Sequence, residues 1–199
     1  FGFIDDTEGG YTSRINASAK LSTYLTNNST WENQLYYSRY HFNLHSNFTF
    51  FLNDPVNGDQ IRQREGRNIF GYHSRFLHHV DLGSWKLHPL YGAGLRLDKT
   101  KNSELSHTIN RNTVLEYTQL GDISEMNAFA YMDQTIENGK WLFNVGARLD
   151  HFKFDYNDKL QSVQQASQQK TIFSPKINVQ YSISKHAQVY VKTGKGFHS

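Results

Sequence analysis

The sequence predicts an all-β protein, an antiparallel up-and-down meander of about eight long strands that forms part of a transmembrane β-barrel. Three observations predict this fold. Apolar and polar residues alternate with a period of two over long stretches, which is typical of strands. Tight turns alternate with longer polar connections along the chain, and every Trp directly follows a tight turn. Short turns on one side of a meander and long loops on the other are the plan of an outer-membrane barrel.

The composition of the 199 residues argues against several other classes of protein. Hydrophobic residues make up only 37% of the chain, but aromatic residues reach 15%, too many for a disordered protein. No apolar run is long enough for a transmembrane helix, whereas a barrel places its lipid-facing residues at every second position. The 21 basic and 18 acidic residues are interspersed without a charged block, which gives no support for a nucleic-acid partner. Cys is absent, so neither a disulfide nor a thiolate site is predicted.

The clearest element is a hairpin whose two arms cover residues 126–136 and 141–149. Each arm alternates apolar and polar residues for about ten residues, close to the length of a strand that crosses a bilayer at a tilt. Asn138-Gly139 stands between the arms and suits a type I′ turn, in which both central residues take positive φ. The polar side of the second arm carries Arg148 and Asp150, so we expect one face of the hairpin to be wet.

The same alternation predicts six further strands, which cover residues 15–25, 31–44, 70–82, 85–97, 177–183 and 187–193. Tight turns are expected near residues 28, 83, 138 and 185. Three long polar loops, of about twenty residues each, are expected over 45–67, 98–122 and 152–172.

Two strands contain irregularities. In 31–44, Trp31 and Leu35 share one parity whereas Tyr36, Tyr40, Phe42 and Leu44 share the other. One extra residue reverses the faces of a strand, so the pattern predicts a β-bulge near Leu35. Pro89 lies inside the strand predicted over 85–97, where a residue without an N–H is expected only at a bulge or an edge.

The three Trp residues lie at corresponding positions in the predicted meander: Trp31, Trp85 and Trp141 each stand immediately after a short turn. This arrangement puts them at one level and predicts a membrane-interface aromatic girdle. The alternative is that they pack in the core of a soluble sandwich.

Several stretches resemble the barrel of TonB-dependent outer-membrane receptors. FSPKINVQY at 173–181 is followed by VYVKTGKGFHS at 189–199, similar to an SPK-containing strand and a strand ending in GKGF in that family. WLFNVGARLD at 141–150 looks like the family's strand with a GxRxD ending. NGDQI at 57–61, leading to RNIFG at 67–71, is similar to another of its barrel stretches.

The resemblance implies an outer-membrane location in a Gram-negative bacterium and active import of a scarce ligand such as a ferric siderophore, cobalamin or a glycan. Barrels of this family have about 22 strands around a plugged lumen. Residues 1–199 are therefore expected to be a partial β-barrel domain, an internal fragment without the plug. The implied partners are outer-membrane lipid, the receptor's own plug domain, the TonB complex and a small ligand. No cofactor is implied. The N-terminal residues 1–11 lack the features of a signal peptide, which agrees with a processed or internal piece.

Polar residues at the long-loop ends of the predicted strands are candidates for ligand or plug contact. These are His45, His73, Arg96, Glu125, Arg148 and Asp150. Arg148 and Asp150 have an alternative interpretation, in which they pair with each other or with neighbouring strands. Gly92 and Gly94 on the same face are expected to let the plug or a bulky side chain approach.

No metal site and no enzymatic activity are predicted. His78 and His79 are adjacent in a strand and point to opposite faces, and His41 lies about 13 Å along the strand from His45. The chain has no Ser-His-Asp order, no carboxylate pair in a predicted pocket and no Gly-rich phosphate loop.

Two other functions stay open. A complete small outer-membrane barrel with a structural or adhesive role predicts that the sheet closes on itself, whereas the receptor hypothesis predicts unpaired first and last strands. A soluble lipocalin-like or sandwich binding domain predicts that Val145, Ala147, Val179 and Val189 lie inside and Asn144, Arg148 and Gln180 outside.

Overall fold

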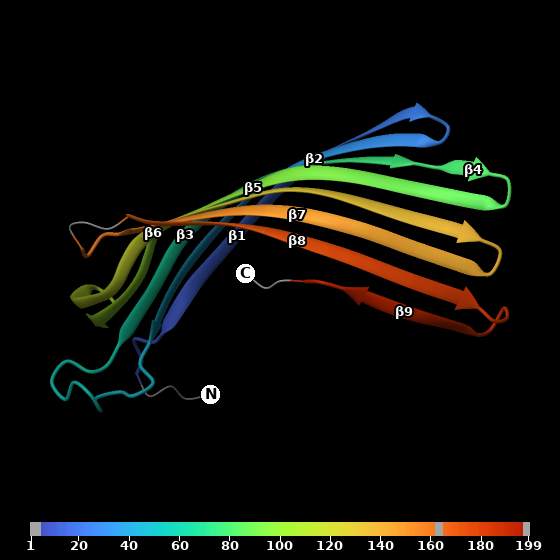
Figure 1. The fold of residues 1–199 in the computed structure, drawn as a ribbon. Coiled ribbons are helices and arrows are strands. Elements are labelled where there is room, and N and C mark those ends of the chain that lie inside the picture. The colour runs from blue at the N-terminus through green and yellow to red at the C-terminus, as the bar shows by residue number, and fades with distance from the viewer. Residues whose placement is uncertain (1–4, 162–164, 197–199) are drawn as a thin grey trace.

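A computed structural model describes residues 5–161 and 165–196, which form one antiparallel sheet (Figure 1). The strands are β1 (Gly9–Thr26), β2 (Ser29–Ser46), β3 (Ile61–His78), β4 (Val80–Leu82), β5 (Trp85–Ile109), β6 (Thr113–Asn138), β7 (Trp141–Asp158), β8 (Gln165–Ser182) and β9 (Gln188–Gly194). The predicted all-β meander is confirmed. Among the described residues no helix is long and apolar enough to span a membrane. The motif positions 197–199 and the loop positions 162–164 lie outside the described residues.

The strands pair in chain order, β1-β2-β3-β5-β6-β7-β8-β9, and the short β4 continues the line of β3 along β5. Figure 1 shows the tight turns together at one end of the bent sheet, the turn end, and the longer connections at the other, the loop end. Over residues 5–161 and 165–196 no ladder joins β1 to β9, so the sheet is open and each of these strands is paired on one side only. This is the pairing that the receptor hypothesis predicted, not that of a self-closing small barrel.

The tight turns have a slightly different form from the prediction. Asn138 pairs with Trp141, so the two loop residues are Gly139 and Lys140. Gly139 has a φ of +57° and Gly83 has a φ of +63° at the first loop position of its hairpin. The second loop residues, Lys140 and Ser84, do not have positive φ. Positive φ at the first central position alone is typical of Gly-X turns of type II′, whereas type I′ requires it at both positions.

Two of the three predicted loops are largely strand, which corrects the sequence analysis. β5 continues to Ile109 and β6 begins at Thr113, so most of 98–122 is a long hairpin; β7 and β8 similarly extend into 152–172. The extensions of β5, β6 and β8 carry polar side chains on both faces, which leaves no hydrophobic period of two to detect. The β7 extension does alternate, but its aromatic residues Phe152, Phe154 and Tyr156 have the parity of Arg148 and Asp150 and therefore lie on the polar face. A long loop remains over 47–60.

The predicted bulge near Leu35 is wrong. The pairing of β2 with β3 is continuous from Ser29 to Ser46, and the register shift between β1 and β2 lies at Tyr24/Thr26, beside the turn. Tyr36 therefore faces the opposite side from Leu35. It fits there because its ring covers Gly71, directly opposite on β3, where any Cβ would overlap the ring.

Pro89 lies at a break in the ladder between β5 and its neighbours β3 and β4. Leu77 pairs with Leu90 and Val80 pairs with Leu87, but the intervening residues of β3/β4 are unpaired. The missing N–H of Pro89 is thus placed where the ladder needs none, and the break separates β4 from β3.

The sheet has an apolar face and a polar face, and the apolar face is the more exposed. Val145 and Leu149 on the apolar face are 44% and 49% exposed, whereas Asp98 and Asp150 on the polar face are 3% and 0% exposed. Ile69 is the sole buried hydrophobic residue among those described, so the sheet has no apolar core of its own. Val145 and Val189 are exposed, contrary to the prediction from a soluble binding domain.

Candidate functional site

The candidate site is the loop-end half of the polar face, where strands β3, β5, β6 and β7 bring ionisable side chains together. Alternation places every second residue of each strand on this face. Directly opposite residues lie on the same face, so the pairs Arg96–Gly71, Asp98–Glu125 and Arg148–Tyr131 all belong to it. The site is thus built by register between strands that are distant in sequence.

Asp98 is the centre of one cluster. Its buried carboxylate accepts hydrogen bonds from Arg67 Nε at 2.8 Å and Nη2 at 2.6 Å, and from Arg96 Nη2 at 3.0 Å. Glu125 lies directly opposite Asp98 on β6. These four residues line a hollow together with Phe152 and Phe154. The two guanidinium groups balance the two carboxylates, so the hollow is polar but nearly neutral.

Asp150 is the centre of a second cluster. Its fully buried carboxylate accepts two 2.8 Å hydrogen bonds from Arg148, from Nε and Nη2, and a 3.2 Å bond from Asn127 Nδ2. The Arg148 guanidinium lies 4.0 Å from the centre of the Phe129 ring. The alternative pairing of Arg148 with Asp150 is therefore present in the structure.

Aromatic rings connect the second cluster to His73. His73 Nε2 is hydrogen-bonded at 2.9 Å to the hydroxyl of Tyr131, whose ring centre lies 5.9 Å from the Arg148 guanidinium carbon. Tyr131 covers Gly92, and Phe129 lies against Gly94. The two glycines thus admit bulky neighbours, as the sequence predicted for this face.

Five of the six predicted contact residues, His73, Arg96, Glu125, Arg148 and Asp150, lie on the polar face. His45 does not. It lies at the loop end on the same side of the sheet as the apolar face, opposite Gly9 and Arg62. Its expected position on the polar face depended on the bulge that β2 lacks.

His45 belongs to a buried polar cluster, the loop-end cluster, in which residues 5–8, the loop 47–60 and the β5–β6 tip meet. Arg111 at the tip bonds the backbone oxygens of Thr7 and Glu8, and Gln60 Oε1 accepts the Arg111 N–H at 2.9 Å. His45 is 6% exposed, and burial lowers its pKa. Its Nε2 has no hydrogen-bond partner among the described residues.

Arg67 and Asn127 belong to the site but were not among the residues predicted from the sequence. Arg67 fell inside the predicted loop 45–67, although the alternation from His73 back through Gly71 and Ile69 reaches it. Asn127 lies in the predicted strand over 126–136 on the polar face, but its contact with Asp150 depends on register between strands.

The His residues of the polar face at the turn end form a hydrogen-bonded pair. His79 Nδ1 and His88 Nδ1 are 3.0 Å apart, and His79 Nε2 is 3.0 Å from Asp81 Oδ2. Within residues 5–161 and 165–196, no group of three or more His, Cys, Asp or Glu side chains is arranged to hold a metal ion.

Arg96 and Arg148 leave part of their guanidinium groups accessible, with side chains 46% and 38% exposed. Their carboxylate partners fix the guanidinium orientation, and the remaining N–H groups can donate to a carboxylate, phosphate or backbone oxygen placed over the polar face. The arrangement is that of a polar surface on which two guanidinium groups are held in fixed orientations.

The family model described as TonB dependent receptor-like, beta-barrel matches residues 2–199. Among solved structures, the unliganded ferric citrate transporter FecA has a TM-score of 0.80 at 14% identity, over 94% of this chain and 28% of that chain. The ferric-catecholate import receptor Fiu from E. coli K12, in its open form, has a TM-score of 0.76 at 10% identity, over 95% and 36%. The ferric yersiniabactin uptake receptor FyuA from Yersinia pestis has a TM-score of 0.66 at 16% identity, over 95% and 29%.

At these identities the structural matches establish a shared fold. The chain spans about a third of the length of the solved proteins that it matches. No curated protein matches the sequence significantly.

Proposed function

We propose that this chain, which belongs to the TonB-dependent receptor-like β-barrel family, forms part of the wall of an outer-membrane receptor that imports a scarce ligand with energy supplied through TonB. Its role is transport and recognition rather than catalysis.

The observation that carries the proposal is the contrast between the two faces of an open sheet. An exposed apolar row needs lipid to cover it, and a polar row with buried ion pairs suits a water-containing lumen. On β7 the apolar row runs from Trp141 to Leu149, about 26 Å at about 3.3 Å per residue. These nine residues are within the range of about 9–11 residues that a tilted strand needs to cross the apolar part of a bilayer.

The three Trp residues support an orientation in this membrane. Each is 45% exposed on the apolar face beside a tight turn. Trp85 and Trp141 lie in one register row through Asn138, and Trp141 packs on Tyr181 with ring centres 4.6 Å apart. We assign Trp31, Trp85 and Trp141 to the girdle at the periplasmic interface, where barrels of this kind have their short turns.

The polar face is the proposed contact surface for the receptor's own plug domain and for the ligand on its way past it. His73, Arg96, Glu125, Arg148 and Asp150 contribute to this surface directly or by holding a neighbour in place. His45 has a different role, in the architecture of the extracellular loops.

The ligand class that the comparisons favour is a ferric chelate, because the solved receptors similar to this chain are named for ferric citrate, ferric catecholates and ferric yersiniabactin. Cobalamin or a similar scarce nutrient is the second candidate, since receptors of this family serve several cargoes.

The test uses the full-length receptor in its own host. Deletion of its gene is expected to abolish uptake of one ⁵⁵Fe-labelled chelate from a panel, and removal of TonB is expected to have the same effect. Membrane fractionation of the tagged receptor should place it in the outer membrane. Uptake that persists without TonB, or a receptor that fractionates with soluble proteins, would contradict the proposal.

A further inference from the structure

A row of polar residues crosses the apolar face just above its apolar band. Arg39, Asn68, Lys99 and Ser124 are direct register partners on β2, β3, β5 and β6, so they lie side by side on one face. The apolar Ile15 of β1 flanks the row on one side, and Asp155 of β7, which is paired with Lys153, flanks it on the other. Arg39 and Lys99 are exposed. Their backbones are two strand spacings apart, about 10 Å. Both side chains are long enough for their charged groups to contact the same bound molecule.

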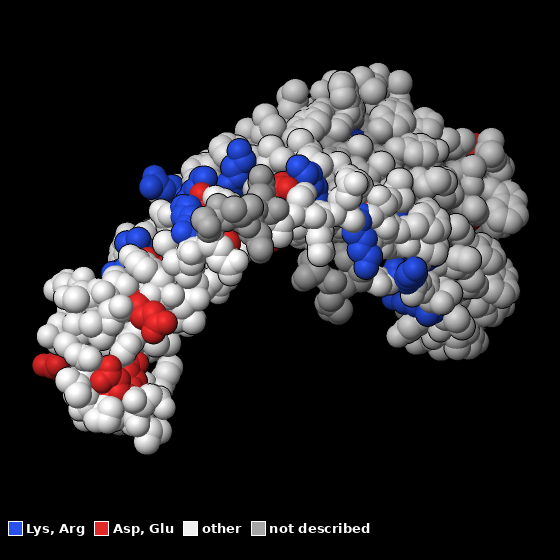
Figure 2. Space-filling model, turned by 60° about the vertical axis from the view of Figure 1, so that its left-hand side comes forward, with Lys and Arg blue, Asp and Glu red and all other residues white. Residues whose placement is uncertain are grey.

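Arg39 and Lys99 differ from the other cations on this side of the sheet. Lys101 is 2.8 Å from Asp122, Lys153 is 3.2 Å from Asp155, and Arg62 is paired with Glu104. Within residues 5–161 and 165–196, Arg39 and Lys99 have no carboxylate partner. Figure 2 shows acidic side chains gathered at the tip of the loop end and basic side chains in the stretch behind it. The row therefore offers uncompensated positive charge.

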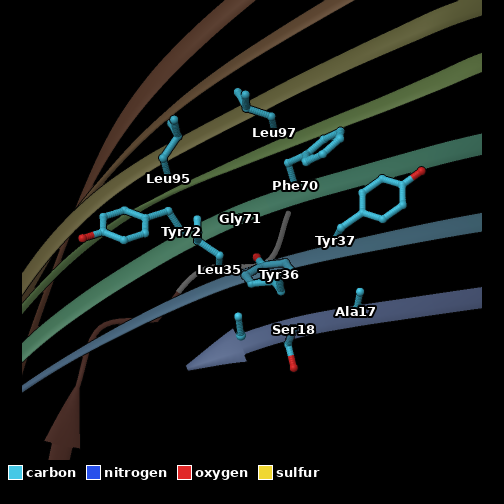
Figure 3. Close-up of a pocket in the computed structure, with 11 residues that line it drawn as sticks. Ala17, Ser18, Leu35, Tyr36, Tyr37, Phe70, Gly71, Tyr72, Leu95 and Leu97 are labelled. Atoms are coloured by element: carbon cyan, nitrogen blue, oxygen red, sulfur yellow. The ribbon is translucent and has the colours of Figure 1, made fainter. Parts of the chain in front are cut away.

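An apolar hollow lies immediately below this row. Tyr37, Phe70 and Leu97, two residues from Arg39, Asn68 and Lys99 on their strands, form its upper border, and Ala17 leaves space beside them (Figure 3). The hollow has a volume of about 510 Å³. The Tyr37 hydroxyl donates to Asn68 Oδ1 at 2.7 Å, and its ring packs on Phe70 at 4.7 Å, so the hollow and the row form one surface.

The two parts have complementary chemistry. A hollow lined by aliphatic and aromatic side chains on a lipid-facing surface suits acyl chains, and a guanidinium, an amide and an ammonium in one row suit phosphate oxygens. A lipid with an anionic head group presents both parts in this order, chains toward the bilayer centre and phosphate at its edge. Two cations separated by two strands fit a head group with phosphates at both ends better than a glycerophospholipid with one.

We propose that the hollow and the Arg39–Asn68–Lys99 row bind a phosphorylated glycolipid of the outer leaflet, of the lipid A type. This inference rests on the proposed function, because the orientation of the sheet in the outer membrane places the row at the outer leaflet. The site is on the lipid side of the wall and separate from the ligand path on the polar face.

The experiment uses the full-length receptor, extracted from outer membranes in mild detergent and stripped of lipid. Native mass spectrometry measures binding of added lipid A and of phosphatidylglycerol. The variants are Arg39→Gln with Lys99→Gln, which removes the free charge, and Ala17→Phe, which fills the hollow without changing charge. The matched control is Lys86→Gln with Lys185→Gln, which removes two exposed cations at the turn end.

We expect the unmodified receptor to bind lipid A more tightly than phosphatidylglycerol. The Arg39/Lys99 variant is expected to weaken lipid A binding roughly thirtyfold, or about 2 kcal/mol at about 1 kcal/mol per cation near an anionic surface. Ala17→Phe should also weaken it, and the control should not. Equal binding of the two lipids, equal losses in variant and control, or no binding at all would each overturn the inference.

Two further measurements separate this inference from the proposed function. Outer-membrane fractionation and TonB-dependent uptake report on the receptor as a transporter. A receptor that passes both tests but shows no Arg39- and Lys99-dependent lipid binding refutes the lipid site alone.

Discussion

The strands differ on the two sides of the Arg39–Lys99 row in the regularity of their pairing and in the kind of side chain that they bury. Toward the turn end, one face is apolar, the other is polar and the pairing of β5 with β6 is unbroken. Toward the loop end, the β5–β6 ladder shifts register three times, between Thr100/Ser103, Leu105/Ser106 and His107/Thr108. There the buried side chains are polar. Glu104, Ser106 and Thr108 are buried on the same side of the sheet that, nearer the turn end, carries the exposed apolar band.

In the proposed orientation, the two regions have different surroundings. Lipid covers the exposed row of the apolar band, so the chain needs no hydrophobic core of its own there. Water surrounds the loop end, where the chain encloses its own polar interior by hydrogen bonds and ion pairs. We therefore expect substitutions in the band to act on the whole barrel and substitutions in the loop end to act locally.

The largest effect is expected for Asp150→Ala in the band. Removal of this buried carboxylate leaves Arg148 and Asn127 without their partner. Loss of one member of a buried ion pair costs about 3–5 kcal/mol, and we expect about 2–3 kcal/mol because Arg148 is partly exposed. Urea unfolding of the full-length receptor in detergent measures the change. Asp155→Ala, which removes a more accessible ion pair with Lys153 (side chains 22% and 48% exposed), serves as the control and should have a much smaller effect.

An equally buried carboxylate at the loop end tests the other half of the comparison. Glu104 accepts a 2.8 Å bond from Arg62 Nε and a 2.8 Å bond from Ser106 Oγ. Glu104→Ala should destabilise the loop end by about 2 kcal/mol without changing the global urea midpoint, because its partners all lie beyond the band. Hydrogen exchange resolved by peptide should accelerate in 100–120 and stay unchanged in 141–150. A fall in the global midpoint equal to that of Asp150→Ala would remove the distinction between the regions.

A smaller effect is expected for Gly71→Ala, again in the band. A Cβ at this position overlaps the ring of Tyr36, so the ring must leave the polar face of β3. Overpacking of this kind costs about 1–2 kcal/mol. Gly66→Ala on the same strand is the control, because the nearest atom to its Cβ is 3.9 Å away.

The double variant Gly71→Ala with Tyr36→Ser identifies the cause. If the clash with Tyr36 is responsible, the double variant loses less stability than the two single variants combined. Strict additivity would mean that Gly71 matters for a reason other than the space it leaves for Tyr36.

This glycine also explains where prediction from the sequence stopped. The strands of the band could be predicted because their apolar residues alternate, and the same parity put Arg96 and Arg148 on the polar face. Tyr36 led to the wrong prediction of a bulge because an aromatic side chain that covers a glycine on the polar face gives the same sequence pattern as one on the apolar face. Only the register of β2 with β3 distinguishes them, and a single sequence does not specify which residues of two strands are opposite.

The candidate site divides in the same way. Arg148 and Asp150 are two residues apart on one strand, so their common face and possible pairing follow from alternation alone. The Arg67–Asp98 pair joins two strands. Its prediction would have required the register between β3 and β5 and the knowledge that β3 extends into a region without apolar alternation. The loop-end cluster could not be predicted for the same reason, since its contacts join segments as distant as Thr7 and Arg111.

The smallest expected effect is a pH response confined to the loop end, and it depends on His45. Burial is the main cause that lowers the pKa of His45, and the charges of Arg111 and Arg62 act in the same direction; the Arg111 backbone hydrogen bond and the Glu104 charge oppose them. Because the folded pKa lies below that of the unfolded chain, acidification protonates the unfolded state first. The stabilisation is complete above about pH 6.5 and declines as the pH falls below it.

After correction for intrinsic rates, hydrogen exchange in 9–11 and 47–60 should therefore be faster at about pH 5.5 than at about pH 7.5. His45→Gln, which carries no titrating group, should remove this difference and leave exchange in 141–150 unchanged. If the pH difference in exchange is as large in His45→Gln as in the unmodified receptor, a group other than His45 causes it, and the prediction is wrong.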